Sequence, residues 1–503
     1  MPSKICTIVD KLKTSNYLKQ LYNWIQKPWI VFIAISLVFG VFYVFSVPAF
    51  GEPDEAAHLN RIYQISEGHL FGQRIPGGKG TYLPKAIVSF ENENNDFLFS
   101  NVFTARTNPN KVLRPIIVSS GPTINTKSQP VPVHFENTEL YSPPVYFPQI
   151  LGMLFAKAIN FTLPQTFYLL RLCGLVSWIT ICAYGIKKMR KIGWAACVLL
   201  LTPLSLLVAS SITADSMTTA LSVLTVGLVI DAIVYTDKLT NKKLPLIFVT
   251  VAFLGLVKPP YLLIATLLLF IPKEKFEEVS FTKIKFFVAS FGVMLLLFGG
   301  WSTIAEQHYI PARQATGGII MNQKAHELFI VEHPFSFLHK IYKTYFRNTA
   351  YYNYRGFFVG YVSQLGLGDP NYVLPDWGVF IYTILLSGVF IYIRQKNKHE
   401  YYLEKYRRYY SLLLVLVLFL AINALIFISW SPISAPLIEG IQARYFIPIT
   451  MPLLFFLLPI YKKDIKLTRT FYATVPLCLV LIQLAAVLAV HYRFYAPALT
   501  PSL

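Results

Sequence analysis

Charged residues are scarce in this chain, which excludes an ordinary soluble domain. Only 14% of its 503 residues are Asp, Glu, Lys or Arg, whereas a soluble domain has about 25%. Apolar residues make up 54% of the chain, and the mean hydropathy is +0.50. This balance is typical of an integral membrane protein, and the 15% of aromatic residues suits transmembrane helices with aromatic belts.

Cysteines are few, and the long polar segments contain none. Cys6 lies in the N-terminal arm, and four others lie in or beside apolar runs: Cys173, Cys182, Cys197 and Cys478. No pair has the spacing of metal ligands, and loops without cysteine form no disulfide. We therefore expect external loops without disulfides and no cysteine metal site.

Motifs for nucleotides and nucleic acids are also missing. The sequence has no P-loop, no Rossmann glycine pattern, no His-Glu-x-x-His and no helix-turn-helix, zinc-finger or RNA-binding signature. Lys and Arg outnumber Asp and Glu by 45 to 25, but they form short clusters between apolar runs, which is a topology signal. We therefore expect no nucleic-acid partner and no chemistry driven by nucleoside triphosphate.

Apolar runs long enough to cross a bilayer dominate the chain. A span needs about 20 apolar residues, and good candidates are 29–47, 167–186, 193–213, 216–235, 284–301, 377–393, 409–430, 444–461 and 470–490. The run after Pro28 is too long for a signal peptide, so we expect a first transmembrane helix behind a basic arm. The stretch 244–272 is broken by Lys258-Pro259-Pro260, which predicts two short segments.

Positive charge predicts the orientation of these spans. Besides the arm, basic clusters occur at 187–191, 238–243, 273–285, 394–408 and 462–469. If 144–162 crossed the membrane, 187–191 and every later cluster would change sides. If 144–162 instead lies in the outer interface and 244–272 turns at an outer Lys258, every cluster is cytoplasmic. The prediction is eleven spans, with the N-terminus inside and the C-terminus outside.

The predicted fold is an all-α polytopic membrane protein in four parts. They are a cytoplasmic arm (1–28), a membrane module (29–301) with an external loop (51–166), a second external loop (302–376) and C-terminal transmembrane helices (377–503). The first loop is rich in Asn, Pro and Thr over 91–143, so we expect irregular structure there. In the second loop, four aromatic residues could stack on sugars or form an interfacial belt: Tyr351, Tyr352, Tyr354 and Phe357.

A cluster of ionisable residues follows the first predicted span directly. The segment 48–58 contains Glu52, Asp54, Glu55 and His58. Ionisable side chains are costly near hydrocarbon, so such a cluster favours a functional site. The alternative is a solvated loop whose acids cap the next helix.

The predicted topology brings further polar residues to the same side of the membrane. Asp215 ends an outward-going span, Lys258 lies at the Pro-Pro turn, and Arg444 with Tyr445 begins an inward-going span. Carboxylates beside cations suit a reaction that needs a base and an anion clamp. Lys258 and Arg444 would hold a phosphate donor while a carboxylate activates an acceptor hydroxyl.

These motifs resemble the lipid-linked-sugar glycosyltransferases of the GT-C superfold, which include protein O-mannosyltransferases and aminoarabinose transferases. Asp54-Glu55 matches the Asp-Glu pair of their first external loop, and Asp215 matches a later Asp at an outer helix end. The segment 141–146, Tyr-Ser-Pro-Pro-Val-Tyr, resembles their His-Pro-Pro-Leu-Tyr motif before a juxtamembrane helix, with Ser142 in place of the His. Since there is no clean Asp-x-Asp, metal dependence is not carried over and no cofactor is expected.

Over roughly residues 29–460 the chain also resembles an uncharacterised bacterial family of multispanning proteins usually placed in that superfold. The matching pieces are 53–58, 258–261 and 440–446. The resemblance implies a GT-C-like bundle with juxtamembrane helices in the bacterial cytoplasmic membrane. It also implies inverting transfer, at the outer face, from a polyprenyl-phosphate sugar to a cell-surface glycan or lipid-linked acceptor.

The same resemblance implies roles for the candidate residues. Asp54 would be the general base, and Lys258 and Arg444 would hold the departing phosphate. Glu52, Glu55 and His58 would position the acceptor or the loop: all three follow the first span closely.

Two other hypotheses stay open. A polysaccharide polymerase or ligase with a polyprenyl-diphosphate donor would need the same two cations. A flippase or ion-coupled transporter would form no glycosidic bond, and transporters bind their substrates near the bilayer midplane. The candidate residues lie at the outer rim of the predicted spans, which favours an enzyme.

Overall fold

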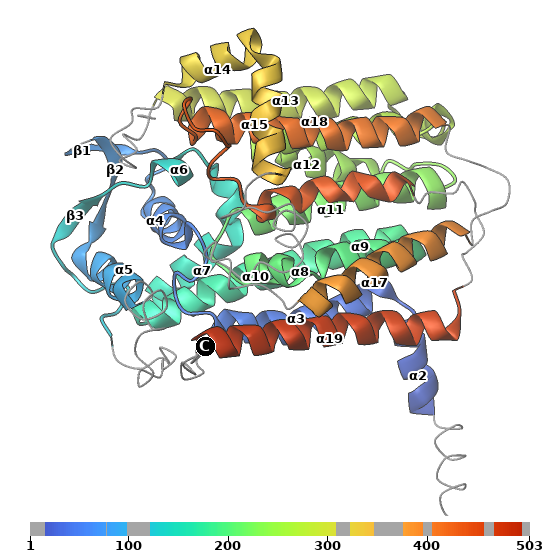
Figure 1. The fold of residues 1–503 in the computed structure, drawn as a ribbon, viewed down its shortest axis with the longest axis horizontal. Helices are drawn as coiled ribbons and strands as arrows, with labels where there is room; N and C mark the ends of the chain where they lie inside the picture. The colour runs from blue at the N-terminus through green and yellow to red at the C-terminus, as the bar shows by residue number, and fades with distance from the viewer. Residues whose placement is uncertain are drawn as a thin grey trace, which may run out of the picture.

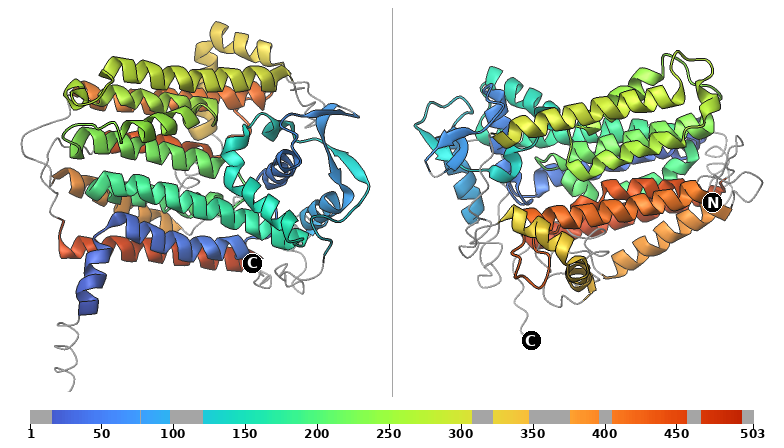
Figure 2. Two further views of the ribbon diagram at one scale, coloured as in Figure 1. Left: turned by 180° about the vertical axis from the view of Figure 1, so that it is seen from behind. Right: turned by 90° about the horizontal axis from the view of Figure 1, so that it is seen from above.

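Long helices and a small sheet make up the protein, in a computed structural model that describes residues 16–76, 78–97, 121–307, 322–346, 376–395, 405–456 and 467–494. The long helices run side by side in one bundle (Figures 1 and 2). The strands and several short helices gather at one end of the bundle, which we call the sheet end. Helix α2 (Asn16–Ile25) projects from the opposite end.

The bundle helices coincide with apolar runs of the sequence. They include α3 (Pro28–Ser46), α8 (Leu163–Met189), α11 (Asp215–Ile230), α13 (Lys283–Gln307), α17 (Asp376–Gln395), α18 (Lys405–Ser429) and α19 (Arg469–Phe494). Among the described residues, six helical stretches are long and apolar enough to cross a membrane, because about 20 helical residues cover 30 Å. The chain is therefore a membrane protein with several apolar helices, accompanied by shorter apolar segments.

Proline divides the predicted span 193–213 into two helices, α9 (Gly193–Leu200) and α10 (Pro203–Ala209). The first residue of α10 is a proline, which lacks the N–H that a continuing helix would use. The side chain of Thr202 caps the new helix by accepting a hydrogen bond from the backbone N–H of Ser205 at 3.1 Å. The predicted span 193–213 therefore consists of two helices, and whether it crosses the membrane stays a prediction.

Short segments also form where the sequence contains other prolines. The stretch 244–272 consists of α12 (Leu244–Leu254) and the 3-10 helix η6 (Pro259–Phe270), which confirms the predicted break at Lys258. In place of a long α-helix near Arg444, two 3-10 helices follow each other, η8 (Ala443–Phe446) and η9 (Pro448–Phe456). Lys258 directly precedes η6, and Arg444 is the second residue of η8, so both cations lie at the beginning of a short helix.

A three-stranded antiparallel sheet lies at the sheet end, in the order β1 (Gln73–Ile75), β2 (Gly78–Pro84), β3 (Pro130–Val133). Helix α5 (Lys85–Phe97) follows β2 directly. The all-α prediction, and that of irregular structure over 91–143, are therefore wrong in these details. The strands are short, and β2 and β3 contain Gly or Pro, so the strands lack the alternating apolar pattern by which strands are recognised.

Four short helices complete the sheet end: α4 (Glu55–Ser66), α6 (Glu136–Glu139), η3 (Pro143–Tyr146) and α7 (Phe147–Ala158). With 12 residues, α7 is about 18 Å long, too short for a bilayer core of about 30 Å. Phe147, Leu151 and Phe155 form an exposed apolar stripe on α7. Helix α7 is therefore too short for a full span, and the location of 144–162 at the membrane surface stays a prediction.

The remaining short helices lie in the predicted second loop and in the basic connections. The second loop contains α14 (Gln323–Glu332) and α15 (Pro334–Phe346). Its predicted sugar-stacking residues, 351–357, lie outside the described part of the chain. The basic connections contain η4 (Arg190–Ile192), the π-helix η5 (Asp231–Tyr235) and η7 (Lys273–Phe276).

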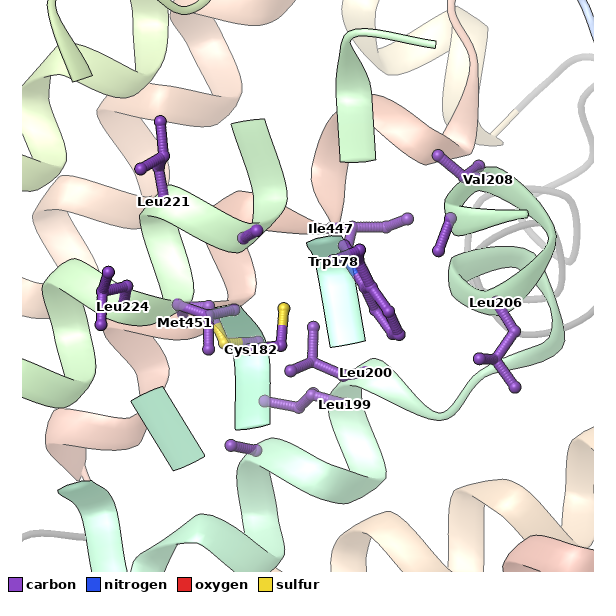
Figure 3. Packing of buried hydrophobic residues seen from close by; sticks show 14 of the residues in the cluster. Trp178, Cys182, Leu199, Leu200, Leu206, Val208, Leu221, Leu224, Ile447 and Met451 are labelled. Carbon is purple, nitrogen blue, oxygen red and sulfur yellow. The ribbon is translucent and has the colours of Figure 1, made fainter. Parts of the chain in front are cut away.

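Helices α8 and α11 pack closely against each other in the buried core. Gly185 and Gly227 face each other there, and a Cβ added to Gly227 would lie 2.4 Å from the carbonyl oxygen of Gly185. Figure 3 shows Trp178, Leu221 and Met451 in the surrounding cluster of buried apolar side chains. The absence of a side chain on both glycines lets the two helix backbones approach.

Gly227→Ala should destabilise the protein, because the new methyl group meets backbone that cannot rotate away. Overpacking of a tight core typically costs 1–3 kcal/mol, so the midpoint of thermal unfolding in detergent should fall. Gly292→Ala is the matched control, since a Cβ there meets no described atom within 4 Å and alanine favours a helix. Equal midpoints for the two variants would contradict the close contact.

Candidate active site

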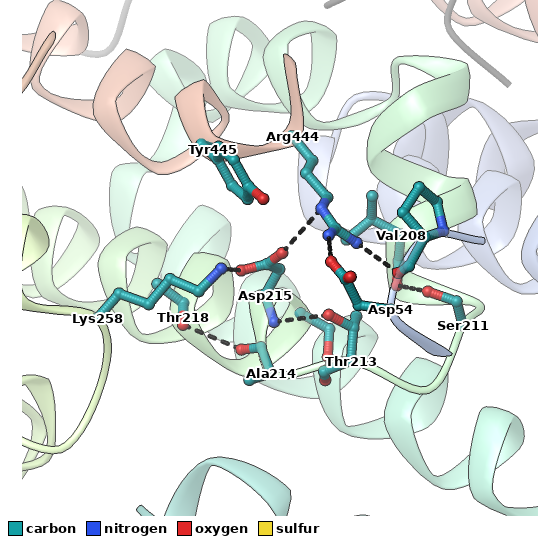
Figure 4. A network of polar contacts seen from close by, with 12 residues as sticks. Asp54, Val208, Ser211, Thr213, Ala214, Asp215, Thr218, Lys258, Arg444 and Tyr445 are labelled. Atoms are coloured by element: carbon teal, nitrogen blue, oxygen red, sulfur yellow. Dashed lines mark hydrogen bonds and ion pairs between the residues drawn. The ribbon is translucent and has the colours of Figure 1, made fainter. Parts of the chain in front are cut away.

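The predicted site residues converge at the sheet end of the bundle. They come from the loop before α4, the first turn of α4, the start of α11, the turn before η6, and η8. Figure 4 shows Asp54, Asp215, Lys258, Arg444 and Tyr445 as neighbours in one polar network. Asp54 and Arg444, which are 390 positions apart in the sequence, are thus brought together by the packing of α4 and the bundle helices.

Arg444 and Lys258 are held by two carboxylates. Arg444 Nη2 lies 2.5 Å from Asp54 Oδ2, and Nη1 donates a hydrogen bond to the carbonyl of Pro53 at 3.0 Å. The Nε of Arg444 lies 3.3 Å from Asp215 Oδ2, while Lys258 Nζ forms an ion pair with Asp215 Oδ1. Asp215 therefore lies between the two cations, whose mutual repulsion it offsets.

The four charged side chains differ in their access to solvent. Those of Arg444, Asp215 and Lys258 are 5%, 6% and 12% exposed, whereas that of Asp54 is 32% exposed. Asp54 is therefore the carboxylate of the cluster that an arriving molecule can reach most easily.

Asp54 occupies the N-cap position of α4 but has an unusual backbone conformation. Its φ angle is 66°, and its side chain makes no cap hydrogen bond with the first turn of α4, a turn that the structure describes in full. Phe50, in the same loop, has a φ of 61°. Left-handed conformations of residues other than glycine cost about 1–3 kcal/mol each and concentrate at functional sites. The alternative that this acid merely caps the next helix is therefore wrong.

Glu55 forms a buried ion pair with Arg171 of α8. Both carboxylate oxygens are used: Arg171 Nε lies 2.8 Å from Oε1 and Nη2 lies 2.7 Å from Oε2. The backbone N–H of Ile212 also donates to Oε1, at 2.9 Å. Because its oxygens are occupied and it is buried, Glu55 is better suited to holding the loop than to contacting a substrate.

Arg171 takes part in the site although it was not among the predicted site residues. Besides Glu55, it donates hydrogen bonds to the carbonyls of Val44, Val47 and Pro48 at 2.7–3.0 Å. It thereby fixes the end of α3 and the start of the acidic loop. A lone arginine within the apolar run 167–186 was the available signal, because a charge there needs a partner.

Glu52 is buried and Oε1 has no hydrogen-bond partner among the described residues. Burial raises the pKa of Glu52 to about 8, since removal from water disfavours the charged form. Glu52 is therefore neutral at pH 7 and adds no negative charge to the cluster.

His58 is also buried and uncharged. Burial lowers the pKa of His58 to about 3. Its Nδ1 lies 2.6 Å from the hydroxyl of Tyr146, and its Nε2 lies 3.4 Å from Thr213 Oγ1. One neutral tautomer satisfies both contacts, with Nδ1 accepting and Nε2–H donating. The Thr213 oxygen also accepts the N–H of Asp215, so His58 orients the start of α11.

Two tyrosine rings surround the ammonium group of Lys258. Its Nζ lies 4.7 Å from the ring centroid of Tyr445 and 5.3 Å from that of Tyr141, distances typical of cation–π contacts. Tyr261 fixes the backbone of Tyr445 by donating to its carbonyl at 2.6 Å. Ser142, which replaces the histidine of the GT-C motif, donates to the carbonyl of Leu256 at 2.5 Å and so holds the turn before Lys258.

A family model described as a predicted membrane protein, DUF2142, matches residues 37–453. The chain belongs to the DUF2142 family. The expected membership of an uncharacterised multispanning family is thereby confirmed. No curated protein and no solved structure matches this DUF2142 member. The matched range contains all eight predicted site residues.

The described part of this DUF2142 protein contains no group of three or more His, Cys, Asp or Glu side chains that could hold a metal ion. The network described above is instead made of ion pairs, hydrogen bonds and tyrosine rings. Its chemistry is that of two carboxylates, two cations and neutral supporting groups.

Glu52→Gln should remove a pH dependence of stability. The pKa of Glu52 is about 8 in the folded protein, against an ordinary value of 4.5. Between these values the folded state keeps a proton that the unfolded chain has lost. The free energy of unfolding therefore falls as pH rises, by up to about 1.4 kcal/mol per unit, and levels off above the folded pKa. Thermal unfolding should show the variant gaining stability over wild type from about pH 5 to about pH 8.

Glu67→Gln is the matched control for this measurement. Glu67 is exposed and forms an ion pair with Lys157, so its replacement should leave the pH profile of unfolding unchanged. A difference between wild type and Glu52→Gln that stays constant across the pH range would show that Glu52 is charged throughout.

Proposed function

We propose that this protein is a glycosyltransferase of the GT-C type that moves a sugar from a polyprenyl-phosphate donor to an acceptor hydroxyl. The observation that carries the proposal is the placement of Asp54 beside Arg444, which Asp215 links to Lys258, at one end of an apolar helix bundle. A partly exposed carboxylate suits a general base, and two cations suit a phosphate leaving group. The bundle supplies an apolar surface for a polyprenyl chain.

The proposed reaction is a single displacement that inverts the anomeric carbon. Asp54 accepts the proton of the acceptor hydroxyl, whose oxygen forms the new bond to the sugar. The bond between the sugar and the phosphate breaks, and the phosphate keeps the electron pair. Arg444 suits this charge because its planar fork donates two parallel hydrogen bonds, while Lys258 acts as a point charge. Glu55 and His58, both buried, position the loop and α11.

The proposed location is the outer face of a bacterial cytoplasmic membrane, with a cell-surface glycan or lipid-linked molecule as acceptor. Support comes from the basic connections around η4, η5 and η7, which join the ends of helices whose other ends bear the site. The positive-inside rule assigns such basic connections to the cytoplasm. The proposed GT-C-like bundle has about eleven spans. It would use the six long apolar stretches, with Leu163–Leu200 counted as two elements, α8 and α9, and the four shorter apolar helices.

Asp54→Asn should abolish sugar transfer while the protein stays folded. Loss of a general base typically lowers the rate 10²- to 10⁴-fold, and asparagine keeps the shape of the side chain. Release of polyprenyl phosphate from a radiolabelled polyprenyl-phosphate hexose would measure turnover, and thermal unfolding would report folding. Glu67→Gln, at the other end of α4, should retain activity. Near-normal turnover in Asp54→Asn would show that another residue is the general base, and Asp215 would be tested next.

Cysteine labelling in intact cells should place the sheet end outside. Cysteines introduced at Glu93 of α5 and Lys187 at the end of α8 are both at exposed positions. An impermeant thiol reagent should modify position 93 on intact cells and position 187 only after permeabilisation. Labelling of position 187 on intact cells, or protection of position 93, would contradict the proposed orientation.

A further inference from the structure

The two cations of the site are already neutralised. Arg444 and Lys258 face Asp54 and Asp215 in three ion pairs, while Glu52 and His58 are uncharged at neutral pH as described above. A phosphate diester that joined this cluster unchanged would add a net negative charge to a largely buried site. Because an unpaired charge is costly there, one of the carboxylates must leave its cation when the phosphate binds.

The contacts of Arg444 show which carboxylate a bound phosphate would displace. A phosphate binds an arginine best through two parallel N–H donors. The outer edge of this guanidinium, formed by Nη1 and Nη2, is already occupied. Nη1 donates a hydrogen bond to the carbonyl of Pro53, and Nη2 pairs with Asp54. The Nε edge faces Asp215. A bidentate phosphate on the outer edge would therefore replace the contact with Asp54.

Asp54 is the more accessible of the two carboxylates. Its side chain is 32% exposed, whereas that of Asp215, which lies between Lys258 and Arg444, is 6% exposed. The left-handed backbone of Asp54 stores strain. The carboxylate of Asp54 also has an alternative binding position. It lies at the N-terminus of α4, where N–H groups and the helix dipole favour an anion.

We propose that the donor phosphate and Asp54 compete for Arg444, so that donor binding itself releases the base. This inference rests on the proposed glycosyl transfer and adds an order to it. Without donor, Arg444 holds Asp54 away from an acceptor hydroxyl. With donor, the phosphate takes the outer edge of Arg444, and the freed carboxylate can accept the proton of the acceptor. The donor therefore binds first.

Charge and proton balance agree with this order. The donor brings one negative charge, which Arg444 and Lys258 receive as Asp54 departs. During transfer Asp54 gains the acceptor proton and becomes neutral, while the phosphate changes from a diester with one charge to a monoester with two. No additional proton, electron or co-reactant is needed. The second charge on the leaving phosphate replaces the one that Asp54 has lost.

Binding of farnesyl phosphate to the purified full-length protein tests the competition without any transfer. The probe carries a prenyl chain on a phosphate, and its affinity can be measured by calorimetry in detergent. Asp54→Asn removes the competing anion and should bind about tenfold more tightly than wild type, the scale of one partly exposed ion pair. Asp54→Glu keeps the charge and should stay near wild type. Arg444→Ala should bind at least tenfold more weakly.

Controls make the result specific to this contact. Glu67→Gln removes one negative charge, as Asp54→Asn does, but from an exposed ion pair with Lys157. It should leave the affinity for farnesyl phosphate unchanged. An affinity of Asp54→Asn equal to or weaker than that of wild type would overturn the competition. So would failure of both proteins to bind the probe. If Asp54→Asn does not fold, Asp54→Ser makes the same prediction.

A measurement on the wild-type protein gives an independent test. Coupling of glycine ethyl ester to Asp54 by a water-soluble carbodiimide, read by peptide mass mapping, should rise several-fold when farnesyl phosphate saturates the site. No rise would overturn the release of Asp54. Competitive binding in a protein that transfers no sugar would overturn only the proposed function. Sugar transfer with an unchanged affinity in Asp54→Asn would overturn only the competition.

Discussion

The buried ion pair between Glu55 and Arg171 is the contact on which the site depends. Arg171 binds the end of α3 and the start of the acidic loop through three carbonyls. Glu55 binds the N–H of Ile212, just before α11. The base candidate immediately precedes Glu55, and Asp215 follows Ile212 by three positions. Loss of either partner would leave an uncompensated buried charge, which typically costs 3–5 kcal/mol, and would free both functional segments at once.

Burial also determines how the remaining polar groups behave. Glu52 and His58 stay uncharged because burial raises the pKa of the first to about 8 and lowers that of the second to about 3. Apart from the pair Glu55–Arg171, the charges of the site are thus confined to two acids and two bases that touch each other. Such a site responds strongly to one added anion, because charges in a buried site of low dielectric interact more strongly than in water.

The sequence was sufficient to predict the apolar helices, the break at Lys258 and the meeting of Asp54 and Asp215 with the two cations, because each leaves a local signal. It was not sufficient for contacts between distant residues. Nothing near Glu55 reveals that its partner is Arg171, 116 positions away. The strands were missed because they are three to seven residues long. The burial of Glu52 follows from packing around the loop and has no counterpart in local composition.

The close approach of Gly185 and Gly227 limits how this chain can vary in length. Arg171 and Gly185 are separated by about four turns of one helix, α8. The number of residues between them therefore determines that Arg171 faces the acidic loop when Gly185 faces α11. Deleting one residue between them would rotate Arg171 by about 100°, away from Glu55. The intervening stretch can therefore exchange one apolar residue for another, but insertions and deletions there are forbidden even though the stretch contains no site residue.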